Sequence, residues 1–543
     1  MARTLRHPDR GREPANRPHA LRQVAPVDGQ YKPHKWLVTV TVMTAALMGA
    51  LDMSIVNVAL PHIRGSLGAS VEEIAWVATG YMLSNVITMP VVALLSARYG
   101  RKRFYIFSVA LFTCTSMLCG LAWDLPSMVA FRVLQGIGGG ALLPLAQAIL
   151  RETYPPKEQA RAMGIYGLGI ILAPAFAPTL GGWLTDNYSW PWIFFINVPV
   201  GVLNVLLIMR FIQDPPYLVR EKAKIDFSGL CLMAIGLGAL QIMLEKGNQR
   251  DWFASHFILY LAIIACFGLL FFVVRELTAD TPAVDLRILK DSNFSSATLL
   301  SGILGIGLFS SLFILPLFLQ QLLGYPALNS GIAVMPRSVG MAVAMPLMGR
   351  VYNRTGPKLL IALGLFINAV SFFLFARLSL DTGYWNIFVP QLLQGIGSGS
   401  IFVALSTAVL STIEKPLLTA ASGLYNMIRQ VFGTVGIALA ATFLTRGETF
   451  YHAVLSEHVN AFGDVAPASL QQLSSFLSSQ GVNVTGSEME ALKLLDGLVT
   501  RQASMLAYNH VYFLIALVYL VSIPLVVLIK DPRLSRGVEM IAE

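Results

Sequence analysis

Apolar residues along this chain gather in blocks of about 20 residues, separated by short segments rich in charged residues, glycine and proline. A helix needs about 20 mostly apolar residues to cross the hydrocarbon core of a bilayer. The pattern therefore predicts membrane-spanning helices, and fourteen blocks fit this length. They are 36–62, 74–96, 104–122, 127–150, 162–184, 192–212, 227–245, 256–275, 294–319, 331–349, 359–377, 387–411, 421–444 and 507–529.

The composition fits a chain that lies mostly within a membrane. Of the 543 residues, 55% are hydrophobic and 13% are charged, and the mean hydropathy is +0.64. Soluble domains carry about 25% charged residues. A transmembrane β-barrel would instead show alternating strands of about ten residues. The sequence thus predicts an all-α polytopic membrane protein.

The net charge of +9 follows the predicted topology. Basic residues gather in the tail 1–35, in alternate loops such as those holding Arg98 and Arg354, and in the tail 531–543. Cytoplasmic loops of membrane proteins carry an excess of Lys and Arg. Both tails are therefore expected in the cytoplasm, and the basic balance does not indicate a nucleic-acid partner.

The chain also repeats itself. One motif recurs at an offset of 256 residues and a second at an offset of 259, at matching places in the pattern of spans. The alternative is that small-residue packing motifs recur by chance, and the nearly constant offset argues against it. Duplicated halves are typical of secondary transporters, which rock one bundle against the other. The matching residues are Met89-Pro90, Arg98, Gly100 and Lys102 with Met345-Pro346, Arg354, Gly356 and Lys358, and Leu134–Gly138 with Leu393–Gly397.

These repeats predict two six-helix pseudo-symmetric halves, 36–213 and 294–530, with two inserted helices and their linkers at 214–293. The second half includes a long external loop, 445–506. Ser469–Leu477 and Ser487–Leu506 have amphipathic patterns, and Ser487 and Glu490 have the spacing of a capping box. An external helical hairpin is expected there, either as a docking element for a partner or as a packed loop.

Asp52 lies deep in the first span, where a charge costs about 2.5–3.5 kcal/mol on the gentlest scale. Arg132 enters the fourth span at a similar predicted height, so the two charges are expected to pair. The repeat places Gln391 opposite Arg132, which indicates that the fold does not demand this charge. The pair is either the proton-coupling site of a carrier or a structural buried ion pair.

Other polar and aromatic side chains within the spans are candidates for lining a substrate cavity. Arg337 matches Tyr81 in the repeat, and it could instead extend to an interface, as could Arg429. The amides could instead form hydrogen bonds between helices. The candidates are Asn57, Tyr81, Asn85, Gln135, Phe309, Phe313, Arg337, Asn426 and Arg429.

Two further sets of residues suggest a moving structure. The repeated loops hold residues that either set the membrane topology by their charge or form a latch between the halves. They are Arg98, Gly100, Arg101, Arg354 and Gly356. Prolines and glycines in the fifth span predict that it is kinked and closely packed. They are Pro174, Pro178, Gly181 and Gly182. Neither a nucleotide-binding loop, a zinc motif nor a catalytic nucleophile motif is visible, so we expect no enzyme activity, cofactor or metal, and a proton gradient as the energy source.

These residues resemble the motifs of the major facilitator superfamily, specifically the fourteen-helix drug:H+ antiporters of the EmrB/QacA type. The resemblance extends from Trp36 to about Lys530. The carrying motifs are Leu51-Asp52 through Pro61, Arg132 through Gly140, Ala173-Pro174 through Gly181-Gly182, and Asp186 through Pro199, the last being closest to the EmrB branch. The chain departs from the family pattern by having alanine at 93, 97, 173 and 177.

The resemblance implies a proton-coupled exporter of lipophilic or amphiphilic toxic compounds in the bacterial inner membrane. It also implies an EmrA-like periplasmic adaptor and an outer-membrane channel as partners, beside the small-molecule substrate, H+ and membrane lipid. Two alternatives stay open: a dedicated exporter or importer of a single metabolite, and a non-transporting membrane sensor or scaffold.

Overall fold

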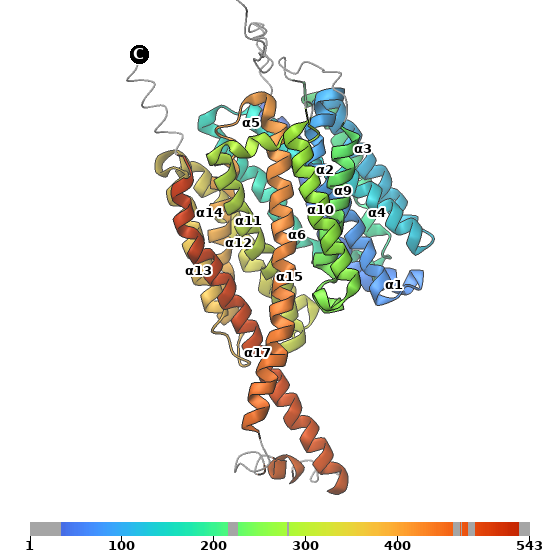
Figure 1. Cartoon of the computed structure of the whole chain (residues 1–543), viewed down its shortest axis with the longest axis vertical. Coiled ribbons are helices and arrows are strands. Elements are labelled where there is room, and N and C mark those ends of the chain that lie inside the picture. The colour runs from blue at the N-terminus through green and yellow to red at the C-terminus, as the bar shows by residue number, and fades with distance from the viewer. Residues whose placement is uncertain are drawn as a thin grey trace, which may run out of the picture.

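The computed structural model describes residues 34–214, 226–279, 282–459, 467, 470–475 and 484–530. Within these ranges the regular structure is entirely helical, as predicted. Figure 1 shows the helices running side by side along the long axis of the molecule. The predicted tail 531–543, and the tail 1–35 apart from its last two residues, lie outside the described ranges.

The helices up to residue 211 correspond to the first six predicted spans. The fourth span is divided into two helices at Gly140, and the sixth begins with a single short turn. The bounds are α1 (Lys35–Leu67), α2 (Val71–Tyr99), α3 (Arg101–Gly120), α4 (Leu125–Gly139), α5 (Leu142–Thr153), α6 (Pro156–Asn187), α7 (Trp192–Phe195) and α8 (Asn197–Phe211).

The remaining long helices correspond to the other eight predicted spans. They are α9 (Phe227–Lys246), α10 (His256–Thr278), α11 (Ser292–Leu317), α12 (Ala327–Thr355), α13 (Pro357–Phe375), α14 (Tyr384–Ala408), α15 (Leu418–His458) and α17 (Val484–Ser522). A π-helical turn, η4 (Phe318–Leu322), extends α11. Short 3-10 turns complete the described connections: η1 (Asn248–Arg250), η2 (Trp252–Ala254), η3 (Leu286–Lys290), η5 (Lys415–Leu417) and η6 (Ile523–Leu528).

In the described ranges, thirteen helical segments are long and apolar enough to cross a membrane, and they match thirteen of the fourteen predicted spans. The fifth predicted span lies in α6, which is not among the thirteen. α6 is nevertheless a continuous helix of 32 residues. The side chains at its positions 171, 172, 175 and 178 lie outside the described part of the chain.

Two equivalent glycines show how the repeat shapes the chain. Gly100 separates α2 from α3 with φ at 90°, and Gly356 separates α12 from α13 with φ at 80°. Their N–H groups donate to the carbonyls of Ser96 and Tyr352. A side chain would be strained at such φ values, so glycine allows this sharp turn at both places.

The helices pack as two groups with an inserted pair beside them. In the first group α1 packs on α6, and α4 packs on α2 and α3; in the second α11 packs on α15, and α14 packs on α12 and α13. α9 and α10 pack on each other, and α9 also contacts α2 and α15. The groups meet where α12 contacts α6 and where α15 contacts α2 and α5. We call this contact region the seam.

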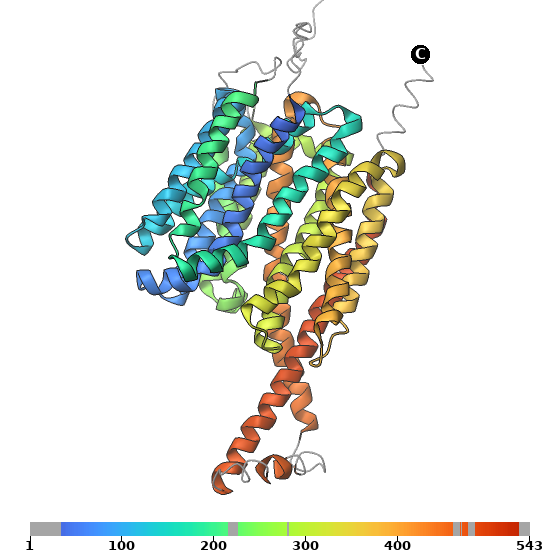
Figure 2. The same cartoon turned by 180° about the vertical axis from the view of Figure 1, so that it is seen from behind.

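The external element differs from the prediction. α15 has 41 residues and α17 has 39, and both continue beyond the end of the bundle as one projection (Figures 1 and 2). Ser487 lies inside α17, so it does not cap the start of a separate helix. Residues 470–475 of the expected segment Ser469–Leu477 are helical. The expected segment Ser487–Leu506 lies within α17, which continues into the last span as one helix and not as a separate helix of a hairpin.

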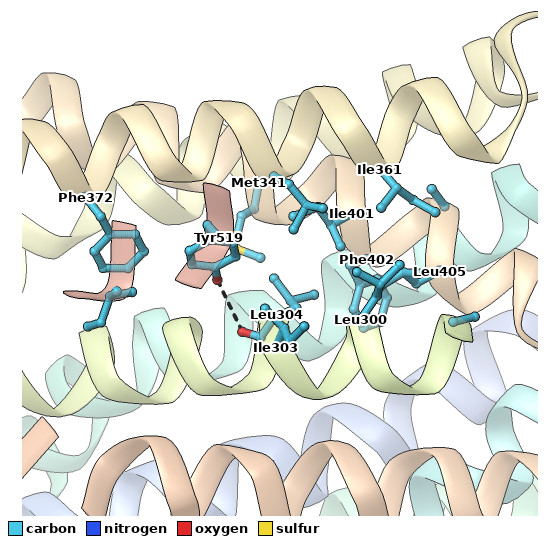
Figure 3. Close-up of a cluster of buried hydrophobic side chains, with 14 of the residues drawn as sticks. Leu300, Ile303, Leu304, Met341, Ile361, Phe372, Ile401, Phe402, Leu405 and Tyr519 are labelled. Carbon is cyan, nitrogen blue, oxygen red and sulfur yellow. Dashed lines mark hydrogen bonds between the residues drawn. The ribbon is translucent and has the colours of Figure 1, made fainter. Parts of the chain in front are cut away.

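The core of the second group is a dense apolar cluster. Phe372 of α13 stacks on Tyr519 of α17 with ring centroids 5.6 Å apart. The Tyr519 hydroxyl donates to the Leu304 carbonyl at 3.4 Å (Figure 3). Met341 of α12 and Ile401 of α14 belong to the same buried cluster.

Candidate functional site

Asp52 is fully buried in the middle of α1 and forms an ion pair with Arg132 of α4. The Arg132 Nη1 atom lies 2.7 Å from Asp52 Oδ2. Both side chains are at most 1% exposed. The predicted pairing is therefore present in the structure, and the two opposite charges cancel in a region without water contact.

The second carboxylate oxygen of Asp52 is also satisfied. Gln135 Nε2 donates to Asp52 Oδ1 at 3.0 Å, and Asn197 Nδ2 donates to the same atom at 3.1 Å. Asn197 also donates to the Ser116 hydroxyl at 3.1 Å. Side chains from α4 and the start of α8 thus meet at the Asp52 carboxylate of α1, and α3 joins the network through Ser116. Buried polar networks of this kind are stable only when every member is partnered.

Arg132 is held by contacts that do not involve Asp52. Its Nε atom donates to the Val77 carbonyl at 3.0 Å, and Nη1 donates to Gln135 Oε1 at 2.8 Å. The guanidinium lies over the Tyr81 ring, 4.2 Å from its centroid. The face of an aromatic ring attracts a cation, so these groups stabilise the arginine even when the aspartate charge is neutralised.

The glycines after Arg132 bring neighbouring helices close to this network. A Cβ at Gly139 would lie 2.7 Å from the Tyr81 hydroxyl and 3.0 Å from Asn85 Nδ2. A Cβ at Gly136 would lie 2.4 Å from the Tyr81 carbonyl. The glycine run therefore serves close helix packing, as small residues do in membrane bundles.

The seam contains a second group of predicted residues. Asn426 of α15 donates to Gln147 Oε1 of α5 at 2.7 Å, and Ser422 donates to the Pro144 carbonyl at 2.9 Å. Arg429 donates to Asn426 Oδ1 at 3.0 Å and lies 5.6 Å from the Tyr425 ring centroid. Asn426 thus joins the two helix groups, and the partly buried Arg429 supports it from within the second group.

Glycines close the seam on the same side of the bundle. A Cβ at Gly423 would lie 2.4 Å from the Met89 carbonyl, and one at Gly164 would lie 2.7 Å from the Met345 carbonyl. Met89 and Met345 belong to the two copies of the sequence repeat. At these two glycines the backbones of the two helix groups are in direct contact, because no side chain separates them. The contacts lie towards the end of the bundle that holds Gly100 and Gly356.

The other cavity candidates are scattered. Arg337 is 6% exposed within the second group. Asn57 is exposed and donates to the Met53 carbonyl of its own helix at 3.4 Å. Phe313 is 36% exposed, whereas Phe309 is packed against Gly433.

The loop and fifth-span candidates differ in their surroundings. Arg101 forms an ion pair with Glu152 of α5 and is 2% exposed, and Arg98 lies near the ring of Tyr99. A Cβ at Gly181 would approach Ile55 of α1 to 2.7 Å, while Gly182 has no such neighbour. Pro174 is partly buried within the continuous helix α6, and the Pro178 side chain lies outside the described part of the chain. Arg354 lies in the last turn of α12, just before Gly356.

Sequence reasoning missed three contributors to the Asp52 network. Asn197 and Ser116 hold one carboxylate oxygen in place, and the Cys119 thiol donates to Gln135 Oε1 at 3.5 Å. An amide at the start of the sixth span is a signal that could have identified Asn197. Serine and cysteine are common in spanning helices, so Ser116 and Cys119 carry no such signal.

Comparison with known proteins places the chain among carriers. The family model described as Major Facilitator Superfamily matches residues 42–437. The fatty acid resistance protein FarB of Neisseria gonorrhoeae is 34% identical over 504 residues, covering 92% of this chain and 97% of that protein. The multidrug export protein EmrB of Escherichia coli is 34% identical over 501 residues, covering 91% and 95%.

Solved structures share the fold at low identity. The human organic anion transporter MFSD10 superposes with a TM-score of 0.58 at 14% identity, covering 90% of this chain and 100% of that one. The proton:xylose symporter XylE superposes with a TM-score of 0.56 at 14% identity, covering 89% and 94%.

Proposed function

Because this chain belongs to the Major Facilitator Superfamily and, within it, to the EmrB-like proteins, we propose that it is a proton-coupled multidrug exporter. Its substrates are lipophilic or amphiphilic toxic compounds, and the proton gradient supplies the energy. The names of the relatives FarB and EmrB, which refer to fatty acid resistance and multidrug export, support this assignment. The observation that carries the coupling mechanism is the buried Asp52–Arg132 pair.

Asp52 is the group that takes up the proton. Protonation removes the negative charge facing Arg132, while Gln135 and Asn197 still donate to the carboxyl oxygen. The arginine keeps the Val77 carbonyl and the Tyr81 ring as partners. The network therefore tolerates both protonation states, and their different charge changes the relative stability of the carrier's conformations.

The change at Asp52 reaches the seam through helix packing. α1 carries Asp52 and packs along α6, and α6 packs on α12 of the other group. Loss of the ion pair weakens the link between α1 and α4, which then consists of the Gln135–Asp52 hydrogen bond, and this allows the assembly to shift. Asp52 is fully buried here, so proton exchange with water requires a second conformation.

The present conformation is the one closed towards the cytoplasm. The seam contacts at Asn426, Gly423 and Gly164 lie towards the end of the bundle that carries Arg98, Arg101 and Arg354. An excess of basic residues is typical of cytoplasmic loops. We place both termini at that face of a bacterial inner membrane and the α15–α17 projection in the periplasm.

The projection is the proposed docking site for an EmrA-like adaptor that continues to an outer-membrane channel. Large apolar side chains on it are exposed, including Phe450 at 61% and Met489 at 60%. Exposed apolar surface of this extent outside the bundle is typical of protein interaction sites. Further exposed apolar residues of the projection are Val459, Leu492, Leu494 and Leu498.

The test is substrate-dependent proton release from reconstituted vesicles. Wild type is compared with Asp52→Asn, which keeps the shape of the side chain but cannot take up a proton. We expect substrate to release protons from the wild type only. Asp251→Asn is the matched control, because Asp251 lies in a connecting turn with φ at 58°, which asparagine tolerates. Undiminished proton release from Asp52→Asn would refute the mechanism.

A further inference from the structure

The second helix group carries a buried arginine without a counter-charge. Arg337 of α12 is 6% exposed, and its Nη1 atom is buried without a hydrogen-bond partner. Among the residues that the structure describes, no carboxylate forms an ion pair with it. A buried charge without a partner is strongly destabilising, so retaining one calls for an explanation.

The equivalent place in the first group is electrically balanced. Arg337 corresponds to Tyr81 at the offset of 256, and Gln391 corresponds to Arg132 at the offset of 259. Ser311 donates to Gln394 Oε1 at 3.2 Å, as Gln135 contacts Asp52 in the first group. Ser311 corresponds to Asp52 at the offset of 259. The second group therefore has an arginine cation, but it has the Ser311 hydroxyl where the first group has the Asp52 carboxylate.

Buried polar groups without partners lie on the helices beside this cation. They are the side-chain nitrogens of Gln391 and Gln394, the Gln391 side-chain oxygen and the Tyr512 hydroxyl. α12 and α14 are close here, because a Cβ at Gly395 would lie 2.1 Å from the Arg337 carbonyl. Gln391 lies one helical turn from Gly395, and Tyr512 of α17 is within electrostatic range of Arg337.

Apolar side chains pack next to the polar groups around Arg337. Phe375 stacks on Tyr512 with ring centroids 5.2 Å apart. Met341 lies one turn beyond Arg337 and belongs to the packed apolar cluster of Figure 3. Apolar side chains thus border the polar groups around Arg337.

We propose that Arg337, Gln391, Gln394 and Tyr512 form a binding site for a single monovalent anion. One guanidinium and neutral donors match one negative charge, and a dianion would leave a second charge buried and unpaired. The anion is either chloride or the carboxylate of an amphiphilic compound. In the second case the site also gives the charge of the exported substrate, an inference that rests on the proposed function.

The test measures thermal unfolding of the purified full chain in a nonionic detergent while sodium chloride or sodium decanoate is titrated. We expect a saturable rise in Tm for the wild type and its loss in Arg337→Gln. Arg377→Gln is the matched control, because Arg377 is exposed at the end of α13 beside Phe373 and should keep the wild-type response. Tyr512→Phe should weaken the apparent affinity about fivefold, the value of one hydrogen bond.

Each result has a defined meaning. Saturation by chloride identifies a free inorganic anion, whereas saturation by decanoate alone identifies the carboxylate of an amphiphile. The site is overturned if the Tm of the wild type does not saturate with either anion, or if the Tm of Arg337→Gln saturates equally. If Arg337→Gln does not fold, an unchanged apparent anion affinity in Tyr512→Phe overturns the site instead. No proton gradient is used, so failure of proton release in the vesicle experiment would leave this result standing.

Discussion

Asn426 of α15 and Gln147 of α5, 279 residues apart in the chain, form a 2.7 Å hydrogen bond across the seam between the helix groups. Both side chains are 1% exposed. A hydrogen bond of this kind contributes about 1 kcal/mol. It therefore shifts the equilibrium towards the closed seam but does not prevent the seam from opening. A carrier that alternates needs contacts of this moderate strength.

Removing this bond should favour opening of the seam. For Asn426→Ala we expect a cysteine introduced at buried Ala148, in a chain without native cysteines, to react with a maleimide about fivefold faster. Asn386→Ala, at an exposed position near the start of α14, is the control and should leave the rate unchanged. Equal rates for Asn426→Ala and the parent protein would contradict the role of this bond.

Gly423 should be needed for full closure of the same seam. In Gly423→Ala the new Cβ would lie 2.4 Å from the Met89 carbonyl, and backbone cannot move aside as a flexible side chain can. We expect slower substrate export and weaker cross-linking of cysteine pairs placed across the seam. Gly497→Ala is the matched control, because nothing lies within 4 Å of a Cβ there. Normal cross-linking in Gly423→Ala would show that the seam is not tightly closed.

Asn197 should contribute to coupling as well as to stability. Asn197→Leu removes the donor to Asp52 and to Ser116, and a buried acceptor that loses its donor costs about 1–3 kcal/mol. Asn204→Leu is a matched control on the same helix, because its side chain donates to the Thr41 carbonyl at 2.7 Å, away from Asp52. We expect both variants to lower Tm, but only Asn197→Leu to reduce proton release per substrate. Equal proton release in the two variants would make Asn197 purely structural.

The sequence predicted the helices and the Asp52–Arg132 pair because both depend on strong local signals. Spanning helices follow from the length of apolar blocks, and a charge in such a block is conspicuous. The division between α4 and α5 at Gly140 and the continuity of α17 through Ser487 depend on tertiary packing. Helix ends are the least predictable feature for this reason.

The grouping of polar residues could not be predicted, because it depends on rotation of the helices about their axes. Tyr81, Asn85 and Gln135 lie at or beside the Asp52 network, whereas Asn426 crosses the seam and Arg429 contacts Asn426. Sequence placed all five in a single candidate cavity. The repeat could have indicated the isolation of Arg337, since its counterpart Tyr81 carries no charge.

The inserted helices α9 and α10 should be held together by a pH-dependent contact. Asp226, just before α9, accepts hydrogen bonds from the Ser228 hydroxyl at 2.6 Å and the Gly229 N–H at 3.1 Å, and pairs with Arg275 of α10 at 3.0 Å. The bond from Ser228, more than the guanidinium, lowers the pKa of this carboxyl to about 2. The Asp226 side chain is 4% exposed but Arg275 is 49% exposed, so solvent screens the pair and the shift from 3.8 contributes at most about 2 kcal/mol of stability.

The folded-state pKa lies below the unfolded value, so this stabilisation is complete above about pH 4 and is lost as the pH falls towards about 2. We expect Asp226→Asn to unfold at a lower temperature than the wild type at pH 7 and pH 5, with the difference shrinking between pH 4 and pH 3. Thermal unfolding of both proteins over this pH range is the measurement. Asp251→Asn, in the turn that connects α9 to α10, should follow the wild type throughout. A difference between Asp226→Asn and the wild type that stays constant down to pH 3 would mean that shape, and not charge, makes Asp226 important.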